Sequence, residues 1–124
     1  MGLKSRQKGK RGERAWVQFL REIAGLTARR GLSQSGGAIE ADVVCEETAG
    51  IHWEVKIGKR QPNLDDAMAQ AKRDAPEGTI PVVAHKKDFA SWMVTLPAED
   101  YLKQILGDLP ETTTTTTQAD KNDE

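Results

Sequence analysis

The sequence has few of the residues and segments that mark secreted or membrane proteins. Its one cysteine, Cys45, cannot form an intramolecular disulfide, and the apolar residues around it favour a small core residue over a nucleophile. No apolar run approaches the roughly 18 residues of a membrane span, and the start MGLKSRQKGKRGER lacks the apolar segment of a secretory signal. We therefore expect a cytoplasmic protein with no membrane partner.

Signals for reading DNA bases are also missing. The sequence has no recognition-helix signature, no zinc-finger spacing and no aromatic pattern of a base-stacking platform. His52 and His85 lie on separate predicted strands with no Cys or carboxylate at zinc spacing, which disfavours zinc ligation. Any binding of nucleic acid should therefore depend on backbone phosphates.

The net charge of −1 conceals an uneven distribution of charge. Residues 1–30 carry nine Lys or Arg against two Glu, whereas residues 107–124 carry one Lys against five acids. The basic front predicts attraction to polyanions, nucleic acid above all, with an ordinary solvated face as the alternative. The acidic, Thr-rich end has nothing with which to build a core, so we expect a single domain over 1–106 and a disordered tail over 107–124.

Hydrophobic spacing predicts the order helix, three strands, helix, two strands, helix (αβββαββα). Trp16, Phe19, Leu20 and Ile23 form the stripe of an amphipathic helix over about 9–24, and Asn63 caps a second helix that ends before Pro76. A possible short strand and a Ser/Gly-rich loop separate the first helix from a hairpin over 41–59. Strands are expected over 79–86 and 90–97, and a terminal helix over 98–106 with Tyr101, Leu102 and Ile105 spaced for burial.

The hairpin carries charges that a purely structural hairpin would not need. If the turn TAG is a three-residue loop ending in Gly50, the register opposes Val43 to Val55, Cys45 to Trp53, Val44 to Glu54 and Asp42 to Lys56. One face is then apolar, and the other collects Asp42, Glu54 and Lys56. Two converging carboxylates repel each other, and a divalent cation would offset that repulsion. The alternative is that Glu54 and Lys56 are ordinary outward-facing strand residues.

Asp42, followed by EVK at 54–56, resembles the signature of the PD-(D/E)xK nucleases. KGKRGER at 8–14, the apolar helix after it, the loop SQSGG and the strand IHWEVK together resemble archaeal-type Holliday junction resolvases, a class also found in phages. The resemblance covers about residues 8–106 and departs from the signature at Ala41, where the family has proline. It implies a small restriction-endonuclease-like α/β fold, a mixed central sheet flanked by helices, and residence in the host cytoplasm if the protein is phage-encoded.

The resemblance also implies a set of site residues. Asp42 and Glu54 would hold Mg²⁺, for which Mn²⁺ could substitute, with the main-chain oxygen of Val55 and a further carboxylate from Glu13. Lys56 would act on the attacking water, and Ser35 would contact the scissile phosphate, with Ser33 as the alternative. No small-molecule cofactor is expected.

The implied activity is resolution of four-way (Holliday) junctions by paired nicks that leave 5′-phosphate and 3′-hydroxyl ends, a step in DNA recombination and repair. Two symmetric nicks call for a C2 homodimer. The residues expected to contact DNA phosphates are basic: Lys8, Lys10, Arg11, Arg14, Arg29, Arg30, Lys59 and Arg60. Two alternatives remain, another PD-(D/E)xK nuclease with nicking, flap or single-strand specificity, and a DNA-binding protein without catalysis.

Overall fold

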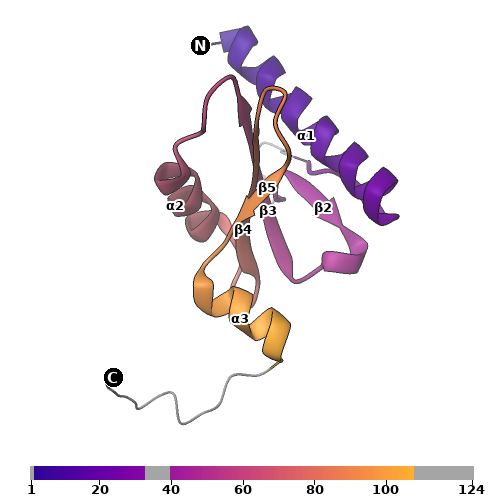
Figure 1. Ribbon diagram of the computed structural model, residues 1–124, viewed down its shortest axis with the longest axis vertical. Coiled ribbons are helices and arrows are strands. Elements are labelled where there is room, and N and C mark those ends of the chain that lie inside the picture. The colour runs from indigo at the N-terminus through magenta and orange to yellow at the C-terminus, as the bar shows by residue number, and fades with distance from the viewer. Residues whose placement is uncertain (1, 33–39, 108–124) are drawn as a thin grey trace.

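A five-stranded mixed sheet between two helices forms the body of the protein (Figure 1). The computed structural model describes residues 2–32 and 40–107, with side chains from residue 9 onward. Its elements follow the chain as α1 (Gly2–Ala24), β1 (Ala28–Arg30), β2 (Val43–Cys45), a short 3-10 helix (Glu46–Thr48), β3 (Ile51–Gly58), α2 (Leu64–Asp74), β4 (Ile80–Lys87), β5 (Met93–Thr95) and α3 (Ala98–Leu106). The predicted order αβββαββα and the predicted fold class are confirmed.

The strands are arranged in sequence order, β1-β2-β3-β4-β5, so β1 and β5 form the two edges. Among the strands in residues 2–32 and 40–107, β3 and β4 form the one parallel pair, and α2 is the crossover that connects them. In such a unit the helix runs back along the sheet, so the last turn of α2 returns toward the start of β3. This geometry matters for the site described below.

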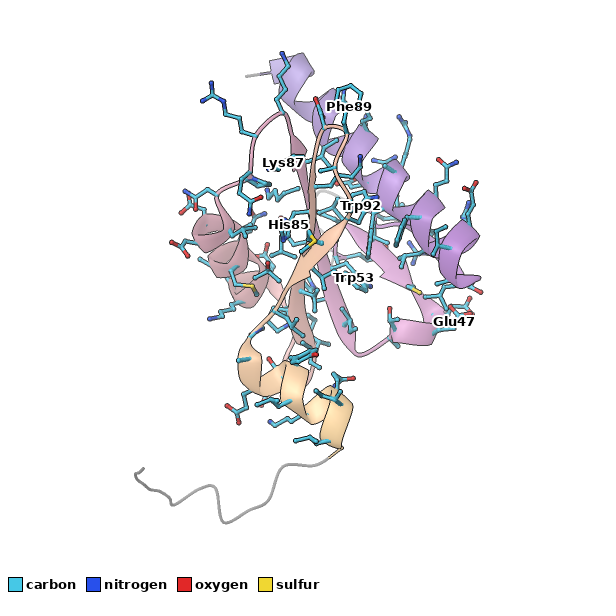
Figure 2. All side chains as sticks on the ribbon, in the orientation of Figure 1. Glu47, Trp53, His85, Lys87, Phe89 and Trp92 are labelled. Carbon is cyan, nitrogen blue, oxygen red and sulfur yellow. The ribbon has the colours of Figure 1, made fainter. Side chains whose placement is uncertain are left out.

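Helices α1 and α2 each cover one face of the sheet (Figure 1). The larger core lies under α1, where Trp16, Val17 and Leu20 pack on Val43 and Val55. The ring of Trp16 lies 5.1 Å from that of Trp53 and 4.9 Å from that of Trp92, both labelled in Figure 2. The smaller core lies under α2 and contains Ala67, Ala71 and Val83, with small residues that let the helix approach closely. The polar site residues share this second face.

Helix α1 begins at Gly2, seven residues before the predicted start at Gly9. Gly12, inside the predicted helix, lies where α1 packs against Ile57 of β3. A Cβ at Gly12 would lie 3.1 Å from Cγ1 of Ile57, whereas a Cβ at Gly9 would meet nothing within 4 Å. Tertiary packing therefore explains one of the two glycines.

The predicted hairpin register was wrong. Val43 pairs with Trp53 instead of Val55, because residues 46–48 form a 3-10 helix instead of continuing the strand into a tight turn. The register moves by two residues, and a shift by an even number keeps every side chain on its predicted face. Val43, Cys45, Trp53 and Val55 are buried together, as expected.

The predicted burial of α3 was also wrong. None of its nine residues, all of which the structure describes, is buried, and Tyr101, Leu102 and Ile105 are 52%, 42% and 58% exposed. The strand before it is shorter than predicted, three residues instead of eight. Most of the expected tail, residues 108–124, lies outside the described residues. No helix in residues 2–32 and 40–107 is long and apolar enough to cross a membrane.

We predict opposite effects for one substitution at the two glycines of α1. Gly12→Leu should lower the free energy of unfolding by about 1–3 kcal/mol, because the larger side chain overlaps Ile57. Gly9→Leu should raise it by up to about 1 kcal/mol, because leucine is the better helix former and a Cβ at this position meets nothing within 4 Å. Urea denaturation of both variants measures the difference. Equal effects would contradict the close contact between α1 and β3.

Candidate active site

Asp42 and Glu54 lie on the face of the sheet that α2 covers. Their chain neighbours Val43, Trp53 and Val55 point into the core under α1, and side chains alternate along a strand. The main-chain N–H of Asp42 donates to the carbonyl of Trp53 at 3.0 Å. The two acids are therefore closer neighbours than the predicted register made them.

The carboxylate of Asp42 is held by the neighbouring strand. Its Oδ2 accepts a hydrogen bond from the N–H of Val55 at 2.9 Å, so the side chain takes the place of a main-chain partner at the start of β2. Asp42 is therefore hydrogen-bonded to both residues that flank Glu54: its main-chain N–H donates to Trp53, and its carboxylate accepts from Val55. Burial raises the pKa of Asp42, while the Val55 N–H and the charge of Lys56 lower it in part.

Glu54 is a buried carboxyl with little to offset its charge. Its side chain is 4% exposed, and Lys56 Nζ lies 3.5 Å from its Oε2. Burial first, and the charge of Asp42 second, raise the pKa of Glu54 to about 7, although Lys56 opposes the change. A buried carboxyl of this kind is common at functional sites and rare where only stability is selected.

Glu13, on α1, lies within electrostatic range of Asp42. Arg30 Nε donates to Glu13 Oε1 at 3.1 Å, which ties the helix to β1. Burial, followed by the charge of Asp42, raises the pKa of Glu13, and Arg30 opposes the increase. The predicted third carboxylate therefore lies in the electrostatic field of Asp42, but its direct partner is an arginine.

The sequence analysis missed Asp74 and undervalued His52. The charge of Asp74, the last residue of α2, contributes to raising the pKa of both Asp42 and Glu54. His52 is 6% exposed, and burial lowers its pKa while Asp74 and Asp42 oppose that decrease. The direction of the crossover could have predicted both, because a helix that runs back from the end of β3 brings its last turn near the first residues of that strand.

The base of the Ser/Gly-rich loop is fastened beside Asp42. Glu40 Oε1 accepts the N–H of Leu32 at 2.9 Å, and the N–H of Gly31 donates to the carbonyl of Asp42, also at 2.9 Å. A Cβ at Gly31 would overlap the carbonyl oxygen of Ala41, so only glycine fits there. Ser35 and its alternative Ser33 lie outside the described residues, and their role stays a prediction.

A basic groove of about 500 Å³ runs between α1 and β1. It is lined by Arg14, Val17, Gln18, Arg21, Glu22, Arg29 and Arg30, and thus includes three of the residues predicted to contact DNA. Arg29 makes a two-pronged ion pair with Glu40 at 2.8 and 2.9 Å. Lys10 and Arg11 are exposed on α1, and Lys59 and Arg60 are exposed after β3, while the side chain of Lys8 is outside the description.

The donor set fits a hard divalent cation held mostly by water and substrate. Among residues 2–32 and 40–107, no three His, Cys, Asp or Glu side chains come close enough together to hold a metal ion. Mg²⁺ usually takes only one or two carboxylates and keeps several waters, so the pair Asp42 and Glu54 is sufficient. Burial first, and the charge of Asp42 second, raise the pKa of Glu54 and so make its ionised form costly, and a bound divalent cation would offset that cost.

The chain matches the model of the family described as "Phage putative PDDEXK endonuclease" over residues 4–124. The chain belongs to this endonuclease family. Membership confirms the resemblance to PD-(D/E)xK nucleases, a class that generally uses divalent metals. No curated protein matches the chain. The phage endonuclease family therefore establishes the nuclease class, and the DNA structure that is cut is a separate question.

We predict that the protein loses stability as pH rises when divalent metal is absent. Glu54 ionises at about pH 7 when folded but near 4.5 when unfolded, so its contribution is complete below about 4.5 and is lost as the pH rises through 7. Between pH 5 and 8 the free energy of unfolding should fall by on the order of 2 kcal/mol more in the wild type than in Glu54→Gln. Urea denaturation in a chelator measures both slopes.

The same experiment has a matched control and a metal arm. Glu46→Gln changes an exposed carboxylate and should keep the wild-type slope. Addition of Mg²⁺ at pH 8 should stabilise the wild type but not Glu54→Gln, because a ligand that binds the folded state stabilises it. Identical pH slopes for the wild type and Glu54→Gln would contradict a raised pKa of Glu54 in the folded protein.

Proposed function

We propose that this phage endonuclease is a Mg²⁺-dependent, structure-selective DNA endonuclease that resolves four-way junctions by paired nicks. The products would be 5′-phosphate and 3′-hydroxyl ends. The observation that carries the proposal is the buried Glu54, held beside Asp42 on one face, with Lys56 two residues along the same strand. Burial of one carboxyl beside another lowers the free energy of unfolding, and a bound cation that engages a phosphate would offset that loss.

Each group has a distinct task in phosphodiester hydrolysis. Asp42 and Glu54 would hold Mg²⁺ or Mn²⁺, with the main-chain oxygen of Val55 as a further ligand. The bound metal ion supplies Lewis-acid polarisation of the phosphate and a lower pKa for attacking water. Lys56, which is partly exposed, would orient that water and offset charge on the phosphate. Glu13 would add a carboxylate after release from Arg30.

Selectivity for junctions would come from shape and charge rather than from bases. The groove between α1 and β1 and the exposed cations after β3 offer phosphate contacts at two separate places near the site. A C2 homodimer would place two such sites for two symmetric nicks. In this proposal residues 1–106 form the nuclease domain, and residues 107–124 are an acidic tail without catalytic groups.

Two other functions use the same observations. Another nuclease of this class would have the same metal site and cut flaps, nicks or single strands. A DNA-binding protein without catalysis would retain the fold and the basic groove. The geometry favours catalysis, because a surface that only binds DNA does not need two neighbouring carboxyls, Asp42 and the buried Glu54, on the face beneath a helix.

Cleavage of a panel of DNA structures tests the proposal. In Mg²⁺, the wild type should cut an immobile four-way junction faster than linear duplex, splayed arms or single strands. Asp42→Asn and Glu54→Ala should each reduce the rate by at least about 100-fold, whereas Glu46→Gln should retain it. Equal rates on all substrates would remove junction selectivity. Unchanged rates in both acid variants would remove the proposed site.

Binding of DNA should depend on salt and on the groove. Arg14 is exposed in α1 and lines the groove. Arg14→Gln should weaken junction binding and reduce the slope of log K against log salt by about 1. Gln104→Glu, at an exposed position of α3, changes the net charge by the same amount away from the groove and therefore serves as the control. An unchanged slope for Arg14→Gln would show that DNA does not pass over this groove.

A further inference from the structure

Helix α3 presents its apolar side to solvent. Ala98, Tyr101, Leu102, Ile105 and Leu106 recur at the spacing of one helix face, and all five are exposed. Figure 1 shows α3 beyond one end of the sheet, away from both α1 and α2. Phe89, another exposed aromatic residue, lies at the opposite end of the molecule in Figure 2 and is not part of this surface.

Such a helix needs something to cover it. Isolated helices shorter than about 12–15 residues are marginal in water, and α3 has nine residues with none buried in the part of the chain that is described. The two stretches outside the described residues have few large apolar side chains in their sequences. Residues 33–39 read SQSGGAI, and residues 108–124 contain six threonines and five acids but only Leu109, Pro110 and Ala119 as nonpolar residues.

The charged residues beside the apolar face of α3 can pair with the same residues in a second copy of the chain. Glu99 and Lys103 lie on one flank of α3, with Lys103 Nζ 3.7 Å from Glu99 Oε2. When two copies of a helix pack antiparallel about a two-fold axis, the same flank of each copy meets in opposite direction. Glu99 then faces Lys103 of the partner subunit, and Lys103 faces the partner's Glu99. In a parallel pair the opposite flanks of the two helices would meet, so Glu99 and Lys103 would not face each other across the contact.

We infer that the apolar face of α3 is the contact surface between two antiparallel copies of this chain. The inference deepens the proposed function, since paired nicks need two sites, but the contact can be measured without DNA. Five side chains are fewer than the 20–30 residues a side of a standard interface. The dimer is therefore weak and reversible, with association that depends on concentration in the micromolar range or above.

Sedimentation equilibrium of the full chain, from about 1 μM to about 1 mM, tests the inference. The wild type should associate to a dimer, and Ile105→Glu should weaken that association at least about tenfold, because the interface would bury an unpaired charge. Gln104→Glu adds the same charge on the opposite flank and should leave association unchanged. Circular dichroism confirms that each variant is folded, as expected for exposed positions.

A charge exchange separates contact between copies from an effect within one copy. Glu99→Lys and Lys103→Glu should each weaken self-association about three- to tenfold, because like charges then face each other across the axis. An equimolar mixture of the two variants should associate as well as the wild type, because opposite charges meet again. Failure of the mixture to recover would overturn the antiparallel arrangement.

Other outcomes decide between occupants of the surface. A wild type that stays monomeric at every concentration, or an Ile105→Glu variant that dimerises normally, overturns the inference. A monomer whose α3 binds neutral lipid vesicles would assign the surface to a membrane instead. A dimer that cuts no junction would keep this inference and overturn the proposed function. A monomer that cuts junctions would overturn this inference and keep the cleavage activity of the proposed function.

Discussion

The hydrogen bond from the Val55 N–H to the Asp42 carboxylate is the interaction on which the candidate site depends. It joins the start of β2 to the middle of β3 and fixes one acid beside another, Glu54. Ordinarily the partner of a strand N–H is a carbonyl, so this site uses a side chain to complete the sheet. Loss of Asp42 would therefore remove a ligand and also leave a strand N–H without its partner.

Burial gives this pair its chemical character. Exposed to water, two carboxylates at a strand end would both ionise and repel each other only weakly, because water screens their charges. Beneath α2, the sheet and the helix remove that water, and Glu54 retains a proton up to about pH 7. The folded state therefore makes ionisation of Glu54 costly, as at many functional sites, and the two hydrophobic cores on either side of the sheet supply stability that offsets this cost.

The core and the site are arranged on opposite faces of the same strand. Trp53 and Val55 point under α1 into the aromatic core, while His52 and Glu54 point under α2. This division explains why the second core is small: Ala67 and Ala71 let α2 lie close enough to bury a carboxyl without a bulky side chain between them. It also leaves the last turn of α2, with Asp74, beside the site. A helix of larger residues would hold the site open to water.

The sequence by itself determined the features that depend on local or periodic patterns of residues. The helix stripe of Trp16 and Leu20, the Asn63 cap and the alternation along β3 predicted the elements, their order and the shared face of Asp42 and Glu54, because these patterns depend on neighbours in the chain. The tertiary structure decided the rest. It set the hairpin register at Val43 and Trp53, brought Asp74 to the site through the crossover, and left α3 uncovered although its spacing predicted burial. Periodicity shows that a helix has an apolar face, but which surface meets that face depends on where the whole chain places the helix.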